Sequence, residues 1–334
     1  MLVTSHDVAR YAGVSQSTVS RALRGVAGVA PETVRRVQEA AAALSYVPSE
    51  AGRTLSTRLT RTVGIVAAEL TNPFYPEMIE PIRLHLDGAG YRTLLVPDSA
   101  EAPIEAERLM DGTIDGVIVL NASEGSPLPA ALERRGIPYV LMNRTVKGAG
   151  GDTCVVDNEG GAGLVADLLA AEGHRSIAAV FGPSTTSTGR ERERGFVTTL
   201  GHHGLALDPS LVRHGSYSHE AGFDACRALL RSHRPTALFC GNDIMAMGAF
   251  DAAASLRLVP GRDLAIIGFD DIAMARWEVF GLTTVRIDLA ALAMHAVELI
   301  LSRLADPSLP QRTVRMTTNL VLRRSHRIDR GLLG

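Results

Sequence analysis

The sequence predicts a small all-α unit at the N-terminus and a larger α/β body of two doubly wound parallel-sheet subdomains. In the first 60 residues, apolar residues recur at helical spacing between recognisable helix caps. From Thr62 onward, short β-rich runs alternate regularly with amphipathic stretches. A chain of 334 residues also exceeds one ordinary hydrophobic core. We therefore expect a three-helix unit, a linker, and two similar subdomains that face each other across a cleft.

Two short helices joined by a tight turn are predicted at the start of the chain. Thr4 and Asp7 form a capping box, so the first helix begins just after Thr4. Gly13 provides the backbone freedom for a sharp turn. Ser15 can then cap the second helix, which Gly25 closes.

The second helix has one apolar face, formed by Val19 and Leu23 four residues apart. Its other side chains are hydrogen-bonding or cationic. A short helix with such a face can enter the major groove of DNA and contact base edges. The first hypothesis is therefore sequence-specific DNA binding through Gln16, Ser17, Ser20 and Arg21.

A third helix is predicted to start at Pro31, because proline fits the first turn of a helix. Its apolar stripe packs against the first two helices and comprises Val34, Val37, Ala41 and Leu44. The resulting unit of about 45 residues is too small to be very stable alone. Residues 49–60 are polar, basic and marginally helical, and Gly52 costs up to about 1 kcal/mol of helix relative to alanine. They form a linker that could fold on contact.

Charge is unevenly distributed along the chain. Residues 1–60 hold seven Arg against four Asp or Glu, a balance of +3, and the remainder holds 27 basic against 32 acidic residues, a balance of −5. The two sum to the net charge of −2. A basic end fits contact with phosphate, because arginines there release counterions. Ordinary surface charge explains the balance equally well, and the helix pattern favours DNA.

Composition excludes several classes of protein. No apolar run approaches the roughly 20 residues of a membrane span, and the N-terminus lacks a signal sequence. We therefore expect a cytoplasmic protein without a membrane partner. The odd number of cysteines and their unpaired spacing argue against disulfides and zinc clusters. Buried, unmodified thiols are expected at Cys154, Cys226 and Cys240.

The strands of the body are predicted from short apolar runs. Some runs, such as residues 116–120 and 264–267, are continuously apolar, as expected of parallel strands covered on both faces. Ligands of such sheets bind beyond the carboxyl ends of the strands. The predicted strands are residues 62–67, 91–96, 115–120, 138–142, 153–157, 176–181, 236–240, 264–269 and 282–287.

Polar side chains follow several of these runs. Asparagine, aspartate and arginine at converging loops offer paired donors and acceptors to the vicinal hydroxyls of a sugar, and an aromatic ring can cover its apolar face. Asparagine and aspartate after a strand are also common turn formers and helix caps, so either role fits each residue. The segments are Asn72-Pro73-Phe74-Tyr75, Asn143-Arg144, Asp157-Asn158, Asn242-Asp243 and Asp270-Asp271.

From Thr4 to about Arg324, the chain resembles the lactose repressor and galactose repressor (LacI/GalR) family of bacterial transcription regulators. The N-terminal motifs are strongly specific, and the strand-end motifs are moderately so. The resemblance rests on Asp7-Val8-Ala9, Ala12-Gly13-Val14-Ser15, Thr18-Val19-Ser20-Arg21, Val47-Pro48 with Arg53 and Leu55, Gly173-His174, Asn242-Asp243, and Gly268-Phe269-Asp270-Asp271.

The resemblance implies a helix-turn-helix head, a body similar to periplasmic sugar-binding proteins, and a homodimer on a near-palindromic operator. It implies that Gln16, Ser17 and Arg21 reach base edges, with Arg21 the best candidate for a bidentate contact to guanine. Leu55 would wedge into the minor groove beside Arg53. The phosphate contacts would come from Thr4, Ser15, Thr18 and Ser20.

In the body, the resemblance implies an effector site between the two subdomains. Arg192 would be the bidentate clamp and Tyr217 the stacking aromatic ring. On charge alone, the run from Arg190 to Arg194 is just a solvated helix start, and only the resemblance promotes Arg192. The implied effector contacts are Phe74, Asn143, Arg192, Tyr217, Asn242 and Asp270.

Some positions depart from the family pattern. Ser49 and Gly52 stand where asparagine and alanine are usual, so the linker helix should form less readily. Ala30 stands where a capping serine is usual, and a lost cap costs about 1 kcal/mol. We expect this head to be looser off DNA than those of its relatives. Ala68 and Asn72 match no single sugar specificity.

Two other motifs compete with this interpretation. The run from Gly161 to Ala166 satisfies a lone dinucleotide-binding pattern, but the resemblance favours a packed strand-to-helix junction there. The cluster His202, His203, His214 and His219 lacks cysteine or carboxylate ligands at metal-binding spacing. No cofactor and no metal are therefore predicted.

The predicted organisation is a DNA-binding domain at 1–47, a hinge at 48–61, and an effector-binding and dimerisation domain at 62–334. Its subdomains are roughly 62–158 plus 288–318, and 159–287 plus 319–334. We expect a nucleoid-associated transcription regulator, a repressor rather than an enzyme, that is controlled by a sugar and forms a dimer or a tetramer. The alternatives are a solute receptor or a sugar-metabolising enzyme with an incidental helical head, and a degenerate member that answers to a phosphorylated partner protein.

Overall fold

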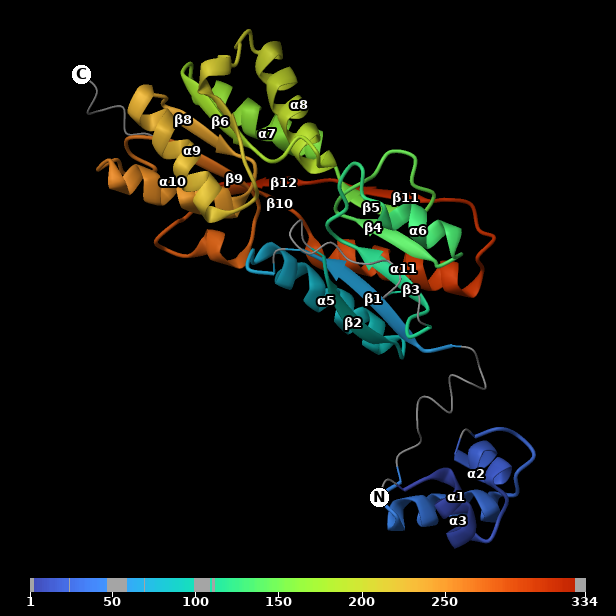
Figure 1. Cartoon of the computed structure of the whole chain (residues 1–334). Coiled ribbons are helices and arrows are strands. Elements are labelled where there is room, and N and C mark those ends of the chain that lie inside the picture. The colour runs from blue at the N-terminus through green and yellow to red at the C-terminus, as the bar shows by residue number, and fades with distance from the viewer. Residues whose placement is uncertain are drawn as a thin grey trace. The chain divides into compact units, whose positions relative to one another are not determined.

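The computed structural model describes residues 3–23, 25–46, 59–68, 70–98, 109 and 112–327. The chain divides into two compact units, residues 1–60 and 61–334 (Figure 1). Most of the predicted linker, including Ser49, Gly52, Arg53 and Leu55, lies outside the described residues. No helix in the described part of the chain is long and apolar enough to cross a membrane.

The N-terminal unit is the predicted three-helix unit. Its capping box is present, since Thr4 and Asp7 exchange hydrogen bonds at the start of the first helix. Gly13 follows that helix with a φ of 65°, and the hydroxyl of Ser15 accepts from the amide of Thr18 at 3.2 Å. Ala30 precedes the third helix without a side-chain cap, as predicted. The helices are α1 (Ser5–Ala12), α2 (Gln16–Leu23) and α3 (Pro31–Ala43), and their core is built on Val8, Val19 and Val37.

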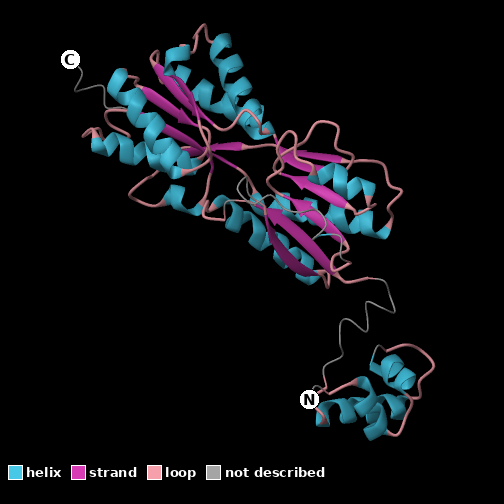
Figure 2. Cartoon of the chain, viewed as in Figure 1, coloured by secondary structure: helices cyan, strands magenta, loops and turns pink. Residues whose placement is uncertain are grey.

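The body contains two six-stranded sheets, each with helices packed on it (Figure 2). The first sheet is parallel throughout, and we call it and its helices lobe 1. Helices α5 (Phe74–Gly88) and α11 (Leu289–Ala305) pack against each other and on this sheet. Helix α6 (Leu128–Arg134) lies in the connection between the strand that ends at Val119 and the strand that begins at Tyr139. In spatial order the strands are β11 (Thr313–Met316), β5 (Asp152–Val156), β4 (Tyr139–Met142), β3 (Gly116–Val119), β1 (Thr62–Ala67) and β2 (Arg92–Pro97).

The second sheet and its helices form lobe 2. Helices α7 (Asn158–Ala171) and α8 (Ser187–His202) cover one face, and α9 (His219–Ser232) and α10 (Asp243–Ser255) cover the other (Figure 1). Two short 3-10 helices, η2 (Pro209–Leu211) and η3 (Ala273–Arg276), lie between these elements. In spatial order the strands are β12 (Asn319–Val321), β10 (Thr283–Arg286), β9 (Ala265–Asp270), β8 (Ala237–Cys240), β6 (Ile177–Phe181) and β7 (Val212–His214).

All the predicted strands are present, with ends that differ by no more than one residue. The prediction lacked β7, β11 and β12. The second sheet is also not purely parallel, because β12 runs antiparallel to β10. The three cysteines are free and buried, as predicted.

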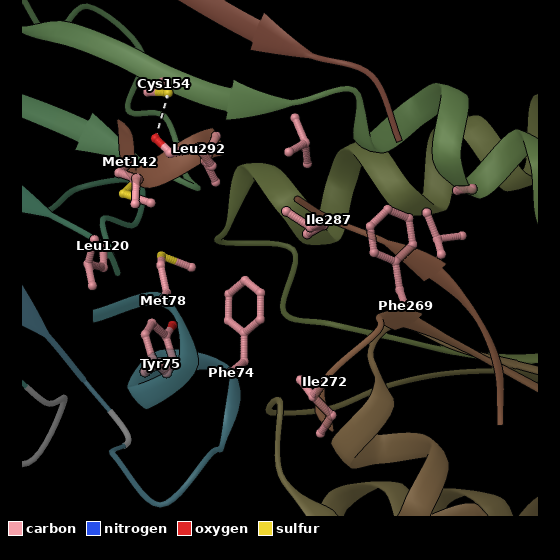
Figure 3. Packing of buried hydrophobic residues seen from close by; sticks show 14 of the residues in the cluster. Phe74, Tyr75, Met78, Leu120, Met142, Cys154, Phe269, Ile272, Ile287 and Leu292 are labelled. Carbon is pink, nitrogen blue, oxygen red and sulfur yellow. Dashed lines mark hydrogen bonds between the residues drawn. The ribbon is translucent and has the colours of Figure 1, made fainter. Parts of the chain in front are cut away.

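One apolar cluster of buried residues extends through both lobes. Phe74 of lobe 1 and Ile272 of lobe 2 belong to the same cluster of buried residues (Figure 3). In this core, the thiol of Cys154 donates to the backbone oxygen of Leu292 (Figure 3). Both lobes are thus anchored in shared packing, and polar residues at the strand ends sit above it.

Candidate functional site

The face predicted to contact DNA is exposed on α2. Gln16, Ser17 and Arg21 are solvent-exposed, whereas Thr18 and Ser20 are partly buried. The exposed side chains therefore project from the helix face opposite Val19, which is fully buried. A short, polar helix face of this kind is what a major groove accommodates.

Hydroxyl groups around the start of α2 are linked by hydrogen bonds. The hydroxyl of Ser15 lies 2.8 Å from those of both Ser17 and Thr18. The side-chain amide of Gln16 donates to the hydroxyl of Ser5 at 3.1 Å. Hydroxyl side chains are among the groups that contact DNA phosphates.

Thr4 is exposed at the start of α1. Its hydroxyl and amide both donate to the carboxylate of Asp7, at 2.7 and 2.9 Å. These hydrogen bonds lower the pKa of Asp7. The predicted minor-groove residues Arg53 and Leu55 lie outside the described residues.

In the body, ten side chains from both lobes line one cavity. All six effector residues predicted from the sequence are among them. The lobe 1 residues are Asn72, Phe74, Tyr75, Asn143 and Arg144, and the lobe 2 residues are Thr188, Arg192, Tyr217, Asn242 and Asp270.

Turns after the strands position the polar side chains of this cavity. Asn72 follows β1, and its carbonyl accepts from the amide of Phe74 at 3.1 Å while its NH2 donates to the backbone of Tyr217 at 3.2 Å. Asn143 follows β4 with a φ of 72°, a conformation that asparagine tolerates. Asn242 caps α10 by accepting from Met245, which leaves its NH2 group for a ligand.

Arg192 is fixed at the centre of lobe 2 and is 3% exposed. Its Nε donates to Asn158 at 3.0 Å, its Nη1 to the backbone of Gly241 at 2.7 Å, and its Nη2 to Asp270 at 3.0 Å. Its guanidinium carbon lies 3.7 Å from the centre of the Phe269 ring. Arginine has five N–H groups, and described residues use three of them here, so two can serve a ligand.

Asp270 ends β9 in an uncommon backbone conformation. Its φ is 117° and that of Asp271 is 57°. Buried Asp243 holds this turn, because its carboxylate accepts from the amide of Ile272 at 3.0 Å. The carboxylate of Asp271 accepts from Arg323 at 2.6 Å. The carboxylate of Asp270 is therefore held toward Arg192 by its neighbours, not by local preference.

Burial and neighbouring positive charges act in opposite directions on the pKa of Asp270. Burial raises its pKa to about 6, and the guanidinium groups of Arg192 and Arg144 limit the rise. The carboxylate oxygens of Asp270, held by Arg192 at 3.0 Å, can accept hydrogen bonds from ligand hydroxyls. The pKa of Asp243 is raised further by burial and by the charge of Asp270.

Tyr217 forms the aromatic wall of the cavity on the lobe 2 side. Its hydroxyl donates to Thr188 at 3.2 Å, and the guanidinium carbons of Arg144 and Arg192 lie 5.6 and 6.0 Å from its ring centre. The ring can approach β6 this closely because residue 182 is glycine, whose Cβ would lie 2.1 Å from the ring. Any side chain at Gly182 would displace Tyr217.

Direct contacts bridge the lobes around the cavity. The carboxylate of Glu77 in α5 accepts from the amide of Ala273 at 3.0 Å. Arg190 in α8 forms an ion pair with Glu124 at 2.8 Å. These contacts hold the lobes close together. About 250 Å³ of space lies between the lining atoms, and part of it is open to solvent.

Four lining residues were not in the predicted effector set. Asn72, Tyr75 and Arg144 were within the segments singled out at strand ends. Thr188 was missed, although it lies one helical turn before Arg192 on α8 and therefore faces the same side. A search for polar residues four positions from Arg192 would have found it.

The glycine-rich run after β5 forms a packed junction, as predicted. Asp157 caps α7 by accepting from Gly160 at 3.0 Å. A Cβ at Gly161 would lie 2.8 Å from the ring of Phe269, so this glycine permits close packing. Three of the four clustered histidines pair with separate carboxylates on the surface, namely His203 with Asp167, His214 with Glu193, and His219 with Asp251.

Known proteins share both parts of this chain. Residues 4–49 match the model of bacterial regulatory proteins, lacI family, and residues 166–326 match that of the periplasmic binding protein-like domain. The chain is 34% identical over 333 residues to the HTH-type transcriptional repressor PurR of Erwinia tasmaniensis. It is 32% identical over 332 residues to the HTH-type transcriptional repressor PurR of Escherichia coli O1:K1 / APEC. Each alignment covers 97% of this chain and 97% of the relative.

Solved structures show the same architecture. A lac repressor dimer bound to operator and the anti-inducer ONPF matches with a TM-score of 0.86 and 25% identity, over 97% of this chain and 99% of that one. A complex of the transcriptional regulator CelR with cellobiose matches with a TM-score of 0.74 and 29% identity, over the same shares.

A helix-turn-helix unit joined to a two-lobed body with a polar cavity defines a ligand-responsive regulator of transcription. The chain belongs to the lacI family of bacterial regulatory proteins. It is a DNA-binding transcription regulator controlled by a small-molecule effector, and not an enzyme.

Proposed function

We propose that this chain is a repressor that binds a near-palindromic operator as a homodimer and responds to a sugar held between its lobes. The observation that carries the proposal is the cavity, where amide, guanidinium, carboxylate and hydroxyl groups surround a small space beside three aromatic rings. Such a set suits the vicinal hydroxyls and apolar face of a sugar. Binding of cellobiose by the CelR structure supports the same class of ligand.

We propose the domain boundaries 1–47, 48–61 and 62–334 for the head, the hinge and the body. The body subdomains would be 62–158 plus 288–318, and 159–287 plus 319–334. The sheet memberships of β11 and β12 support this division, since the chain returns to lobe 1 and then to lobe 2 at its end. As a chromosome-binding protein it would act in the cytoplasm.

Coupling between cavity and operator would run through the closure of the lobes. The contacts of Glu77 with Ala273 and of Arg190 with Glu124 hold the two lobes together. An effector that binds one state, with these contacts formed or broken, more tightly than the other shifts the population between the closed and the open body. The hinge that precedes β1 would transmit that shift to the heads of the dimer. The effector can change operator affinity only by its differential affinity for the two states.

The proposal is tested with the full chain, its operator and a panel of sugars and nucleosides. The operator is selected from random DNA, and each compound is scored by thermal shift and by its effect on operator affinity. A ligand at 100 times its dissociation constant adds about 2.7 kcal/mol of stability. A protein that selects no sequence would contradict the DNA assignment, and a panel without effect on stability or affinity would contradict a sugar effector.

The first specific prediction concerns Arg21. Arg21→Ala is expected to weaken operator binding by about 1 to 3 kcal/mol and to relax base preference at one position in each half-site, because a bidentate contact to guanine is lost. The measurement is a binding profile across single-base operator variants. Arg10→Ala, at an exposed arginine of α1 paired with Asp7, is the matched control and should leave that profile unchanged. An unaltered profile for Arg21→Ala would exclude Arg21 from base contact.

The surface of lobe 1 supports the proposed homodimer. Leu84 of α5 and Leu94 and Leu95 of the edge strand β2 are 54%, 40% and 40% exposed. An edge strand with exposed leucines is prone to pair with another chain. The lac repressor structure of the same fold is a dimer. We therefore place this apolar surface of Leu84, Leu94 and Leu95 in the dimer interface.

The second prediction is that Leu94→Glu converts the dimer to a monomer and weakens operator binding. The buried charge would oppose association, and a monomer offers one head where a dimer offers two. Sedimentation velocity measures the mass and also separates a dimer from a tetramer. Leu164→Glu, at an exposed leucine of α7, is the control. A dimer that survives Leu94→Glu would place the interface elsewhere.

A further inference from the structure

Arg144 differs from the other charged residues of the cavity because its guanidinium has no carboxylate partner in the described part of the chain. The lining holds two arginines and one carboxylate, and that carboxylate, Asp270, is paired with Arg192 at 3.0 Å. Arg144 donates through Nη1 to the backbone oxygen of Asn121, at a long 3.3 Å. Its Nε is shielded from solvent and meets no acceptor among the described residues.

The two arginines also differ in what they can offer a ligand. Arg192 uses Nε, Nη1 and Nη2 on three separate protein oxygens. Arg144 uses one N–H of Nη1 within the described residues, and its Nε is shielded, so the end formed by Nη1 and Nη2 is what it can offer a ligand. Two adjacent NH2 groups match the two oxygens of a carboxylate or phosphate. The guanidinium is also held in place, since its carbon lies 5.6 Å from the centre of the Tyr217 ring.

Partial burial makes this spare positive charge costly. A charge removed from water needs a partner, and the lobes already close around the cavity. Asp270 is hydrogen-bonded to Arg192, and Arg144 acts on it only through its charge, so the lining side chains keep an excess of one positive charge. Glu77, the other carboxylate whose charge reaches Asp270, lies outside the lining and accepts from the amide of Ala273. A neutral sugar would leave that charge unpaired, whereas an oxyanion on the ligand would pair with it.

The lobe 2 side of the cavity offers polar groups for the rest of the ligand. Asp270 and Asn242 offer an acceptor and a donor for hydroxyl groups on the lobe 2 side. Resting on the proposed function, we infer that the effector is an acidic sugar, either a sugar acid or a sugar phosphate, whose oxyanion binds Arg144.

Pairs of sugars that differ by one acidic group test this inference. The probes are D-glucose against D-glucuronate and glucose 6-phosphate, and D-ribose against ribose 5-phosphate. Each is added to the full chain, with thermal shift and operator anisotropy as readouts. We expect at least one acidic sugar to raise Tm and change operator affinity at a concentration where its neutral counterpart does neither. The carboxylate and phosphate members distinguish the two sources of the oxyanion.

Variants of Arg144 complete the experiment. Arg144→Gln removes the charge and should weaken binding of the acidic sugar roughly 10- to 100-fold. Arg144→Lys keeps the charge without the bidentate edge and should retain part of the affinity. Arg213→Gln is the matched control, because that guanidinium donates to backbone oxygens of Ser210 and Val212 and does not line the cavity.

The outcomes separate this inference from the proposed function. A neutral ligand that binds the wild type and Arg144→Gln equally would overturn the inference and leave a sugar-controlled repressor standing. Failure of every acidic sugar to act on the folded wild type would overturn the inference as well. Absence of operator binding by the wild type would instead overturn the proposed function.

Discussion

Arg192→Leu is expected to destabilise the body by about 3 to 5 kcal/mol and to abolish the effector response. Removing this guanidinium leaves the carboxylate of Asp270, 3% exposed, without its partner at 3.0 Å. Breaking a buried ion pair by deleting one member has costs of this size. The variant also loses the bonds to Asn158 and Gly241 that connect α8 to α7 and to the end of β8. Urea unfolding followed by the fluorescence of Trp277, the single tryptophan, reports on the body.

Two controls distinguish an ion-pair effect from general damage to α8. Arg194→Leu removes a 59% exposed arginine of the same helix, whose surface pair with Glu159 should contribute at most about 1 kcal/mol. The double variant Arg192→Leu with Asp270→Leu should be more stable than Arg192→Leu alone, because no isolated charge remains. If Arg192→Leu lowered the free energy of unfolding no more than Arg194→Leu does, the buried ion pair would contribute no more to stability than the surface pair.

Most of the fold could be predicted from the sequence because its strands are buried. Strands β1, β3, β4 and β9 are buried along their whole length, so they appear as continuous apolar runs. The three strands that were missed lie at or near sheet edges and are short. For example, β11 alternates exposed and half-buried residues, and β12 has only three. Such segments leave no apolar run, and tertiary pairing alone makes them strands.

The cavity was predictable in part because the carboxyl ends of parallel strands converge. That rule brought Asn143, Asn242 and Asp270 together without any knowledge of the contacts. Arg192 lies on a helix, and this rule about strand ends does not predict its position in the cavity. It lies within a run of alternating charges, yet it is buried while Arg194 is exposed, because only one side of α8 meets the sheet. The pairing of Arg192 with Asp270, 78 positions apart, has no local sequence signal.

Arg144 illustrates a different limit. The sequence placed it after a strand, but its significance depends on what it lacks, namely a carboxylate partner among the described residues. Absence of a partner cannot be judged before the surroundings are known. The three-helix head was easier, since its caps and turn are local: Thr4 with Asp7, and Gly13 with its φ of 65°.

Asp152→Ala is expected to destabilise the body by about 3 to 5 kcal/mol as well, but at a place remote from the cavity lining. The carboxylate of Asp152 is fully buried at the start of β5 and accepts from Arg303 at 2.7 Å and from Arg312 at 3.2 Å. Arg303 lies near the end of α11 and also donates to the backbone of Pro310 at 3.0 Å. Removing the carboxylate therefore leaves two arginines without their carboxylate partner where α11 returns to β11.

The pH dependence of this loss identifies its cause. Burial acts to raise the pKa of Asp152, but the hydrogen bonds from Arg303 and Arg312 outweigh it and hold the pKa below the ordinary 3.8. A carboxyl whose pKa is lowered by folding stabilises the protein above its unfolded pKa, and this contribution disappears as pH falls through the folded pKa. The gap between wild type and Asp152→Ala should therefore be widest near neutral pH and shrink below about pH 4. Asp167→Ala, at a 56% exposed carboxylate beside His203, should change stability by less than about 0.5 kcal/mol. A gap that stayed constant down to acid pH would mean that Asp152 acts through packing and not through its charge.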